Sequence, residues 1–235
     1  MWYRADLKQK ARACIRANYW PLVLISLIFW LVSGNAFFDG LNINLNFSIP
    51  FDFSFSFRNK LLWSWHDMPI WTSSGLVILI LDIFFLPPLI VGCNRFFLTA
   101  MDERPLIDCI LQNFHRGYGN TVKVMFLRSL FTVLWGLLLI IPGIVKSYEY
   151  RMIPYLLAEY PEMPREEVFQ ASRDLMYGHK LNTLVLDLSF LGWIVLSACT
   201  FGLLGIFYVI PYRNMTNAQL YRALCQADQS EEPTL

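Results

Sequence analysis

Residues 122–160, VKVMFLRSLFTVLWGLLLIIPGIVKSYEYRMIPYLLAEY, decide the fold class of this chain. They begin with an apolar run long enough to cross a bilayer, which takes about 20 residues. Pro142 and Gly143 interrupt the run, and a shorter apolar segment follows that carries Lys146, Glu149 and Arg151. Charges inside a spanning segment are costly, so they need partners or a wet cavity. The stretch predicts a membrane protein with a tight hairpin at the Pro-Gly pair.

The composition of the whole chain agrees with a membrane protein. Hydrophobic residues make up 56% of the chain and charged residues 16%, whereas soluble domains are nearer a quarter charged. The net charge of +1 gives no argument for nucleic-acid binding, and we expect membrane lipids as partners. The five scattered cysteines include no C-x-x-C pair, so they indicate neither a disulfide framework nor a zinc site. We expect no cofactor.

The apolar runs predict an all-α, polytopic transmembrane bundle in one domain, 1–224, with a polar, disordered tail at 225–235. Six spans are expected, and they lie at 21–38, 73–99 (kinked by Pro87 and Pro88), 122–141, 144–160, 181–200 and 203–224. One long kinked helix over 122–160 is the alternative, and it would move the C-terminal half to the other side. Basic residues in 161–182 favour the hairpin, because inner loops carry such residues. Six spans place both termini on the inner side.

Outside these spans, the segment 3–19 predicts an amphipathic helix that has a basic stripe and no small-residue cleavage site after it. Such a helix suits the anionic inner leaflet, and the alternative is a helix with its charges in water. Its basic and apolar sides consist of Arg4, Lys8, Arg12 and Arg16, and of Leu7, Ala11, Cys14 and Ile15. The segment 164–178 predicts a second amphipathic helix, and 106–114 a short surface helix.

The segment 39–71 predicts an extracytoplasmic loop rich in Phe and Asn. Within it, LNINLNFSIPFDFSFSF alternates apolar and polar residues, and a period of two is typical of strands. A β-hairpin around Pro50 is therefore expected. An exposed row of phenylalanines favours aggregation, so the row is expected to pack on lipid, on the bundle or on another copy of the chain.

Three motifs in the second half carry a resemblance to a known family. They are GLLLIIPGIVKSYEYRMIPYLLAEYPEM, then ASRDLMYGHK, then LDLSFLGWIVLSACTFGLLGIFYVIPYRNMTNAQLYRAL. In that order they resemble a bacterial integral-membrane family called domain of unknown function 975, over about residues 92–224. The family is similar, more distantly, to the membrane domain attached to some glycerophosphodiester phosphodiesterases. The resemblance implies a multi-helix bundle in a bacterial cytoplasmic membrane, and it implies no phosphodiesterase activity, because the chain has no soluble catalytic domain.

Charges within the predicted spans define a candidate ligand-binding site, which consists of Asp82, Arg95, Lys146, Glu149, Arg151 and Asp187. With a rise of 1.5 Å per residue, Arg151 and Asp82 lie at matching depths below the outer face, so a buried pair is expected. Arg95 and Asp187 both lie close to the inner face. One interpretation is a polar cavity for an anionic or zwitterionic ligand such as a lipid head group, with Arg151 as the leading anion-binding residue because an Arg fork suits phosphate.

The other interpretation is that these pairs only hold helices together. Lys146 and Glu149, three residues apart on one helix, are expected to face each other. No Ser-His-Asp order, H-E-x-x-H, GxGxxG or P-loop occurs in the sequence, so no catalytic residue is predicted.

These observations lead to three function hypotheses. The first is a non-enzymatic membrane protein that binds or moves a lipid-like or small amphiphilic ligand, or supports an envelope process. The second is a structural or scaffold module that acts through protein–protein contacts, as a homo-oligomer or with a membrane-protein partner. The third, an intramembrane enzyme, has no positive support from the motifs.

Overall fold

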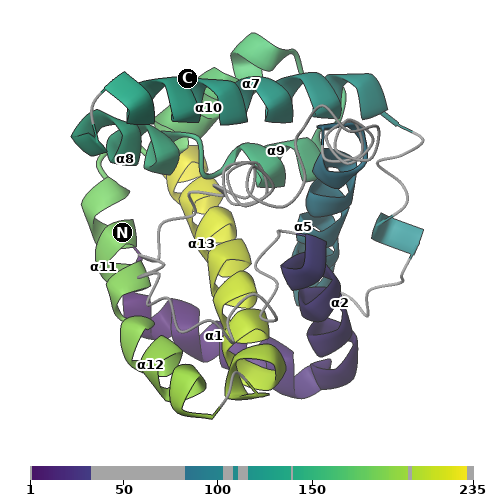
Figure 1. Ribbon diagram of the computed structural model, residues 1–235, viewed down its shortest axis with the longest axis vertical. Helices are drawn as coiled ribbons and strands as arrows, with labels where there is room; N and C mark the ends of the chain where they lie inside the picture. Colours follow the sequence, from purple (N-terminus) through teal and green to yellow (C-terminus); the bar gives the residue numbers. More distant parts are fainter. Residues whose placement is uncertain are drawn as a thin grey trace, which may run out of the picture.

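The computed structural model describes residues 2–32, 83–102, 108–110, 116–138, 140–200 and 203–231, and the regular secondary structure in these ranges is helical. The named helices are α1 (Arg4–Ala17), α2 (Tyr19–Val32), α5 (Leu86–Asp102), α7 (Tyr118–Leu138), α8 (Ile140–Glu149), α9 (Ile153–Glu159), α10 (Arg165–Leu175), α11 (Lys180–Leu188), α12 (Leu191–Cys199), the π-helix η2 (Gly205–Val209) and α13 (Ile210–Glu231). In Figure 1, α2, α5, α11 and α13 run lengthwise. There α1 crosses one end, and α7 to α10 lie at the other. The predicted all-α class is confirmed.

Helix α13 is the centre of the bundle and packs against α1, α2 and α5. Tyr212, Met215 and Tyr221 on this helix are fully buried. The interruption expected at Pro211 is a π-helical turn, in which the N–H of Ile210 bonds to the carbonyl of Gly205 five residues back. The tail predicted to be disordered is instead helical as far as Glu231, because adding residues to an existing helix costs much less than starting one.

Helices α7 and α8 pack side by side as two separate helices. A Cβ built on Gly143 would lie 2.6 Å from the Cα of Gly136. Seven residues of one continuous helix would separate these positions by about 10 Å, so the alternative of a single kinked helix over 122–160 is wrong. The predicted turn position is also wrong. Pro142 and Gly143 lie inside the first turn of α8, where proline is tolerated.

The predicted fourth span, 144–160, is two helices rather than one. Helix α8 ends at Glu149, and α9 begins at Ile153 with Pro154 in its first turn. Proline has no N–H to donate to the carbonyl four residues back, so the helix breaks before it. Six of the seven residues of α9 are buried, and α9 packs against α5. This segment therefore belongs to the core of the protein.

Two helical stretches, Tyr118–Leu138 and Lys180–Ser197, are long and apolar enough to cross a membrane. In the apolar 18-residue segment of each stretch, only 22% of the residues are buried inside the protein. The second stretch combines α11 and α12. Among the residues described, no further helix is both long enough and apolar enough to cross a membrane. The six-span topology and the single domain therefore stay predictions. The loop 39–71, Asp82 and most of 106–114 lie outside the described residues. The expected interruption of the second span lies at Phe85, just before Pro87.

The apolar side of α1 contacts protein and not lipid, and a position of α1 at the inner leaflet stays a prediction. Leu7, Ala11 and Ile15 are buried, and α1 packs along α13. An apolar stripe of this kind must be buried, but its sequence does not specify whether protein or lipid covers it. The sequence signal therefore fitted a protein contact as well as a lipid one.

The basic stripe of α1 makes specific contacts with the bundle. Lys8 donates a hydrogen bond from Nζ to Ser189 Oγ at 2.6 Å and lies 4.6 Å from the centre of the Phe190 ring. Arg12 Nε donates to the hydroxyl of Tyr212 at 3.2 Å. The pKa of Lys8 is lowered mainly by partial burial and, to a smaller extent, by repulsion from neighbouring arginines. These contacts attach α1 to both α13 and the junction of α11 with α12.

The second predicted amphipathic helix is confirmed as α10. It begins after Pro164 with two glutamates in its first turn, and its buried face includes Val168 and Ser172. Gly178 follows with a φ of +73°, in the left-handed region that glycine adopts without steric cost. Helix α10 thus ends where the sequence predicts, and the chain turns into α11.

Candidate functional site

A buried ion pair joins Arg151 to Asp187. Arg151 Nη1 donates to Asp187 Oδ2 at 2.5 Å, and Nη2 donates to Oδ1 at 3.0 Å. Nη2 also donates to Asn217 Oδ1 at 2.8 Å, and both charged side chains are only 2% exposed. Arg151 lies in the turn between α8 and α9 that the break before Pro154 creates, Asp187 lies on α11 and Asn217 on α13. One guanidinium therefore connects three parts of the chain.

Aromatic contacts complete this pair. Tyr148 donates its hydroxyl to Asp187 Oδ2 at 3.0 Å, and the Arg151 guanidinium lies 5.5 Å from the centre of the Tyr148 ring. Both carboxylate oxygens of Asp187 thus accept hydrogen bonds. A fork-to-fork pair with added hydrogen bonds is the arrangement that makes a buried charge tolerable. The contacts of Arg151 join the turn after α8 to α11 and α13.

The depths of the charges along their predicted helices do not predict the pair of Arg151 and Asp187. Asp187 pairs with Arg151 rather than with Arg95, and Asp82, the predicted partner of Arg151, lies outside the described residues. These depths assume straight helices perpendicular to the membrane. Because 144–160 breaks after Glu149, the depth of Arg151 does not follow from its distance along the sequence.

A second charge cluster surrounds Glu149. Its Oε2 accepts a hydrogen bond from Lys146 Nζ at 2.6 Å, and its Oε1 accepts one from Lys180 Nζ at 2.5 Å. Ser172 Oγ donates to the backbone carbonyl of Glu149 at 2.6 Å. The predicted contact between Lys146 and Glu149 is confirmed. The contact of Lys180 with Glu149 was not predicted.

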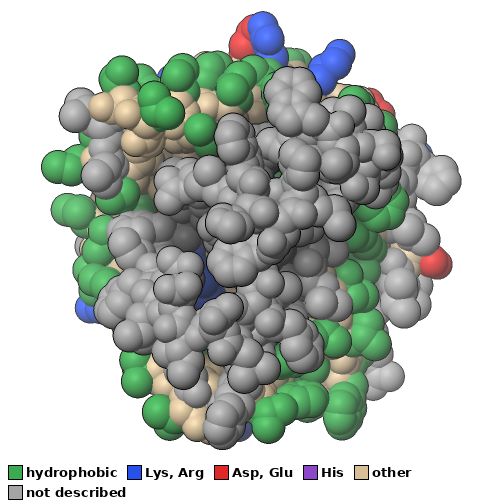
Figure 2. All heavy atoms as spheres, viewed as in Figure 1, with side chains coloured by type: hydrophobic (Ala, Val, Ile, Leu, Met, Phe, Trp, Pro, Cys, Tyr) green, Lys and Arg blue, Asp and Glu red, His purple; other side chains and the backbone are tan. Residues whose placement is uncertain are grey.

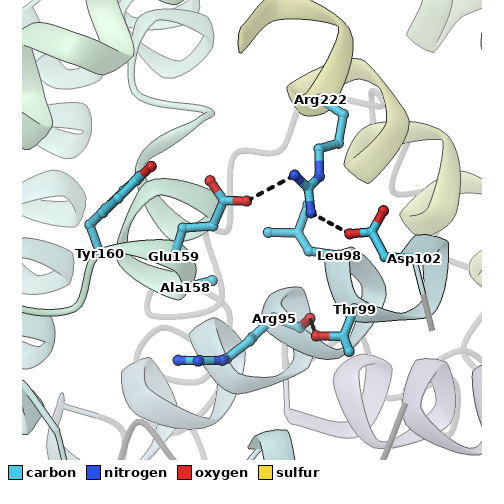
Figure 3. A pocket seen from close by; sticks show the side chains of 8 residues that line it. All are labelled: Arg95, Leu98, Thr99, Asp102, Ala158, Glu159, Tyr160 and Arg222. Atoms are coloured by element: carbon cyan, nitrogen blue, oxygen red, sulfur yellow. Dashed lines mark hydrogen bonds and ion pairs between the residues drawn. The ribbon is translucent and has the colours of Figure 1, made fainter. Parts of the chain in front are cut away.

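A polar cleft lies at Arg95. Its volume is about 430 Å³, and it is lined by Arg95, Leu98, Thr99, Asp102, Ala158, Glu159, Tyr160 and Arg222. Figure 3 shows that these residues come from α5, from the end of α9 and from α13. The predicted inner ends of spans two, four and six thus meet at one place.

The charges of the cleft are unequally paired. Arg222 Nη2 donates to Asp102 Oδ2 at 2.7 Å, and Arg222 Nη1 lies 3.6 Å from Glu159 Oε1. Tyr221 donates its hydroxyl to Glu159 Oε2 at 2.8 Å. Within the described ranges, no carboxylate pairs with Arg95, whose side chain extends away from Asp102 in Figure 3. A half-buried guanidinium without a counter-ion favours binding of an anion.

Sequence reasoning selected only Arg95 among these lining residues. Asp102, Glu159 and Arg222 were not predicted as site residues. The one available signal was that all three lie near predicted inner ends of spans.

In the described residues, no three His, Cys, Asp or Glu side chains gather closely enough to hold a metal ion.

Comparison with known proteins finds one matching family model and no activity. Residues 120–228 match the family model described as "Protein of unknown function (DUF975)", which confirms the predicted resemblance. The match begins later than the predicted start near residue 92, so it includes Arg151, Asp187 and Arg222 but not Arg95. No curated protein matches the chain, and no solved structure matches it.

Proposed function

We propose that this chain, whose residues 120–228 match the model of a family of unknown function, is a non-enzymatic, multi-pass membrane protein that binds or moves a lipid-like or small amphiphilic ligand. Its location is a bacterial cytoplasmic membrane, with both termini on the cytoplasmic side. The ligand site is the cleft at Arg95 rather than the buried pair of Arg151 and Asp187.

Uncovered apolar side chains support the membrane location. Leu137, Ile141 and Leu181 are 84%, 77% and 76% exposed, and the two membrane-length stretches carry many more such side chains. Figure 2 shows hydrophobic side chains along much of the rim of the molecule. Burying one leucine side chain gains roughly 1.5–3 kcal/mol, and monomeric soluble proteins rarely expose large contiguous apolar patches. A surrounding bilayer supplies the missing apolar contacts.

The single observation that carries the ligand proposal is the guanidinium of Arg95, which lines a cleft and pairs with no carboxylate among the described residues. An Arg fork binds phosphate or carboxylate with two parallel hydrogen bonds. Lipids supply such anions at the membrane surface. Arg151, the leading anion-binding residue on sequence grounds, has its fork filled by Asp187 and Asn217.

The buried pair supports the alternative function, a structural or scaffold membrane module. A sealed network that fixes α11 and α13 to the turn after α8 makes a stiff frame, and the exposed apolar faces of α7 and α12 would then contact a second copy or another membrane protein. This alternative needs no ligand in the cleft. Substitution of Arg95 separates the two functions.

The test is the thermal unfolding of the detergent-purified chain with and without added lipid extract. We expect lipid to raise the midpoint of the wild type by several degrees, since a ligand that binds only the folded state stabilises it. Arg95→Gln should lose most of this rise. Arg165→Gln is the matched control and should keep this rise, because the Arg165 side chain is 62% exposed and its ion pair in the described part of the chain is with its neighbour Glu166. An equal rise in both variants would contradict a ligand site at Arg95.

A further inference from the structure

The cleft at Arg95 has separate positive and negative sides. Arg222 carries one positive charge against two carboxylates, those of Asp102 and Glu159. This side therefore retains one negative charge. Arg95, which comes from another turn of α5, supplies one positive charge on the other side. In Figure 3 its guanidinium lies apart from the Arg222–Asp102 pair.

We propose that this cleft recognises a zwitterionic head group, in which a phosphate binds Arg95 and a neighbouring ammonium binds the carboxylates of Asp102 and Glu159. The inference rests on the proposed function, because it names the chemistry of the same ligand. A ligand with a phosphate alone would satisfy Arg95 but leave the surplus carboxylate charge unbalanced. A ligand with an ammonium alone would leave Arg95 without a partner.

Exposure of the carboxylates fits a role in binding. Asp102 and Glu159 have side chains that are 63% and 26% exposed, so an ammonium can reach both from the cleft. Glu159 is held in place by the Tyr221 hydroxyl, whose ring stacks on Tyr155 in the core, with 5.5 Å between the ring centres. Charge-assisted hydrogen bonds from an ammonium to carboxylates are stronger than neutral ones. The ammonium therefore adds selectivity to the binding that the phosphate provides.

The test measures which lipid the full chain retains from a mixture. The detergent-purified protein is mixed with equal amounts of phosphatidylethanolamine and phosphatidylglycerol, and bound lipids are counted by native mass spectrometry. Both lipids carry a phosphodiester, but only the first has an ammonium. We expect the wild type to retain phosphatidylethanolamine several-fold over phosphatidylglycerol. Asp102→Asn and Glu159→Gln should bring that ratio close to one, while Arg95→Gln should reduce retention of both lipids.

Each outcome has a defined meaning. A wild-type ratio near one, or a ratio unchanged in both carboxylate variants, would overturn the zwitterion proposal while leaving lipid binding intact. No retention of either lipid by the wild type would instead overturn the proposed function. Asp102→Asn guards against misfolding, because this carboxylate is mostly exposed and its loss should not disturb the core.

A second experiment with soluble O-phosphoethanolamine distinguishes a lipid head group from a free zwitterion as the ligand. Thermal stabilisation by this compound equal to that by the lipid would assign the site to a free zwitterion, and weaker stabilisation would assign it to the lipid.

Discussion

Arg151 and Asp187 form a two-pronged ion pair in the interior of the bundle, with Nη1–Oδ2 at 2.5 Å and Nη2–Oδ1 at 3.0 Å. They come from the turn after α8 and from α11, which are 36 residues apart in the sequence. Because both side chains are 2% exposed, water cannot replace either partner. The pair therefore fixes the position of α11 relative to α8 and α9.

Removing one member of this pair should destabilise the protein strongly. Arg151→Met leaves the Asp187 carboxylate buried without its counter-charge, and such losses typically cost about 3–5 kcal/mol. The measurement is unfolding of the purified chain in detergent. Arg151→Met combined with Asp187→Leu should recover much of the loss, because no buried charge then remains. Asp187→Asn with unchanged stability would contradict a structural role for the pair.

The cluster at Glu149 should contribute less. Lys146 and Lys180 are 25% and 29% exposed, whereas the Glu149 side chain is only 12% exposed. Water therefore screens the lysine end of each pair, and we expect a contribution at the upper end of the range for exposed pairs, which is about 0–1 kcal/mol. Glu149→Gln should lower the free energy of unfolding by about 1 kcal/mol, as measured by denaturant unfolding. Glu162→Gln, at an exposed position, is the control and should have little effect. A loss from Glu149→Gln as large as that from Arg151→Met would show that screening was overestimated.

The contact between α7 and α8 should not tolerate a side chain at Gly143. A Cβ there would lie 2.6 Å from Gly136 Cα, and overpacking of this kind costs about 1–3 kcal/mol. Gly143→Ala should therefore lower the unfolding midpoint. Gly119→Ala on α7, where a Cβ would meet nothing within 4 Å, should leave the midpoint unchanged or raise it. Equal effects of the two substitutions would mean that α7 and α8 are not in contact.

Labelling of single cysteines tests the predicted topology. In an otherwise cysteine-free chain, we expect Glu162→Cys to react only from the cytoplasmic side and the native, exposed Cys199 only from the outside. An impermeant maleimide applied to intact cells and to inverted vesicles measures both. Reaction of position 162 from the outside would overturn the six-span prediction.

Local sequence patterns predicted the local features of the fold. Helical spacing predicted the basic residues that recur every four positions on α1 and the contact of Lys146 with Glu149. It also predicted α10 approximately. Partners distant in the sequence did not follow from such patterns. Pro154 moves Arg151 into a turn, and only the packing of α11 against α8 brings Asp187 within reach.

The candidate site was predicted in part for the same reason. Arg95 was recognised because a charge inside an apolar run is unusual. Asp102, Glu159 and Arg222 lie where apolar runs end, and charges at such positions are ordinary. Their meeting in one cleft depends on how α5, α9 and α13 pack, and a single sequence carries no record of these contacts.

Native mass spectrometry of the wild type and Arg95→Gln tests the central claim most directly. The chain is purified with its endogenous lipids and released from detergent in the spectrometer, with Arg165→Gln as the control. The wild type and the control should each carry bound lipid, and Arg95→Gln should have lost most of it while keeping its folded charge-state distribution. Equal lipid retention in wild type and Arg95→Gln would contradict a lipid site in this cleft.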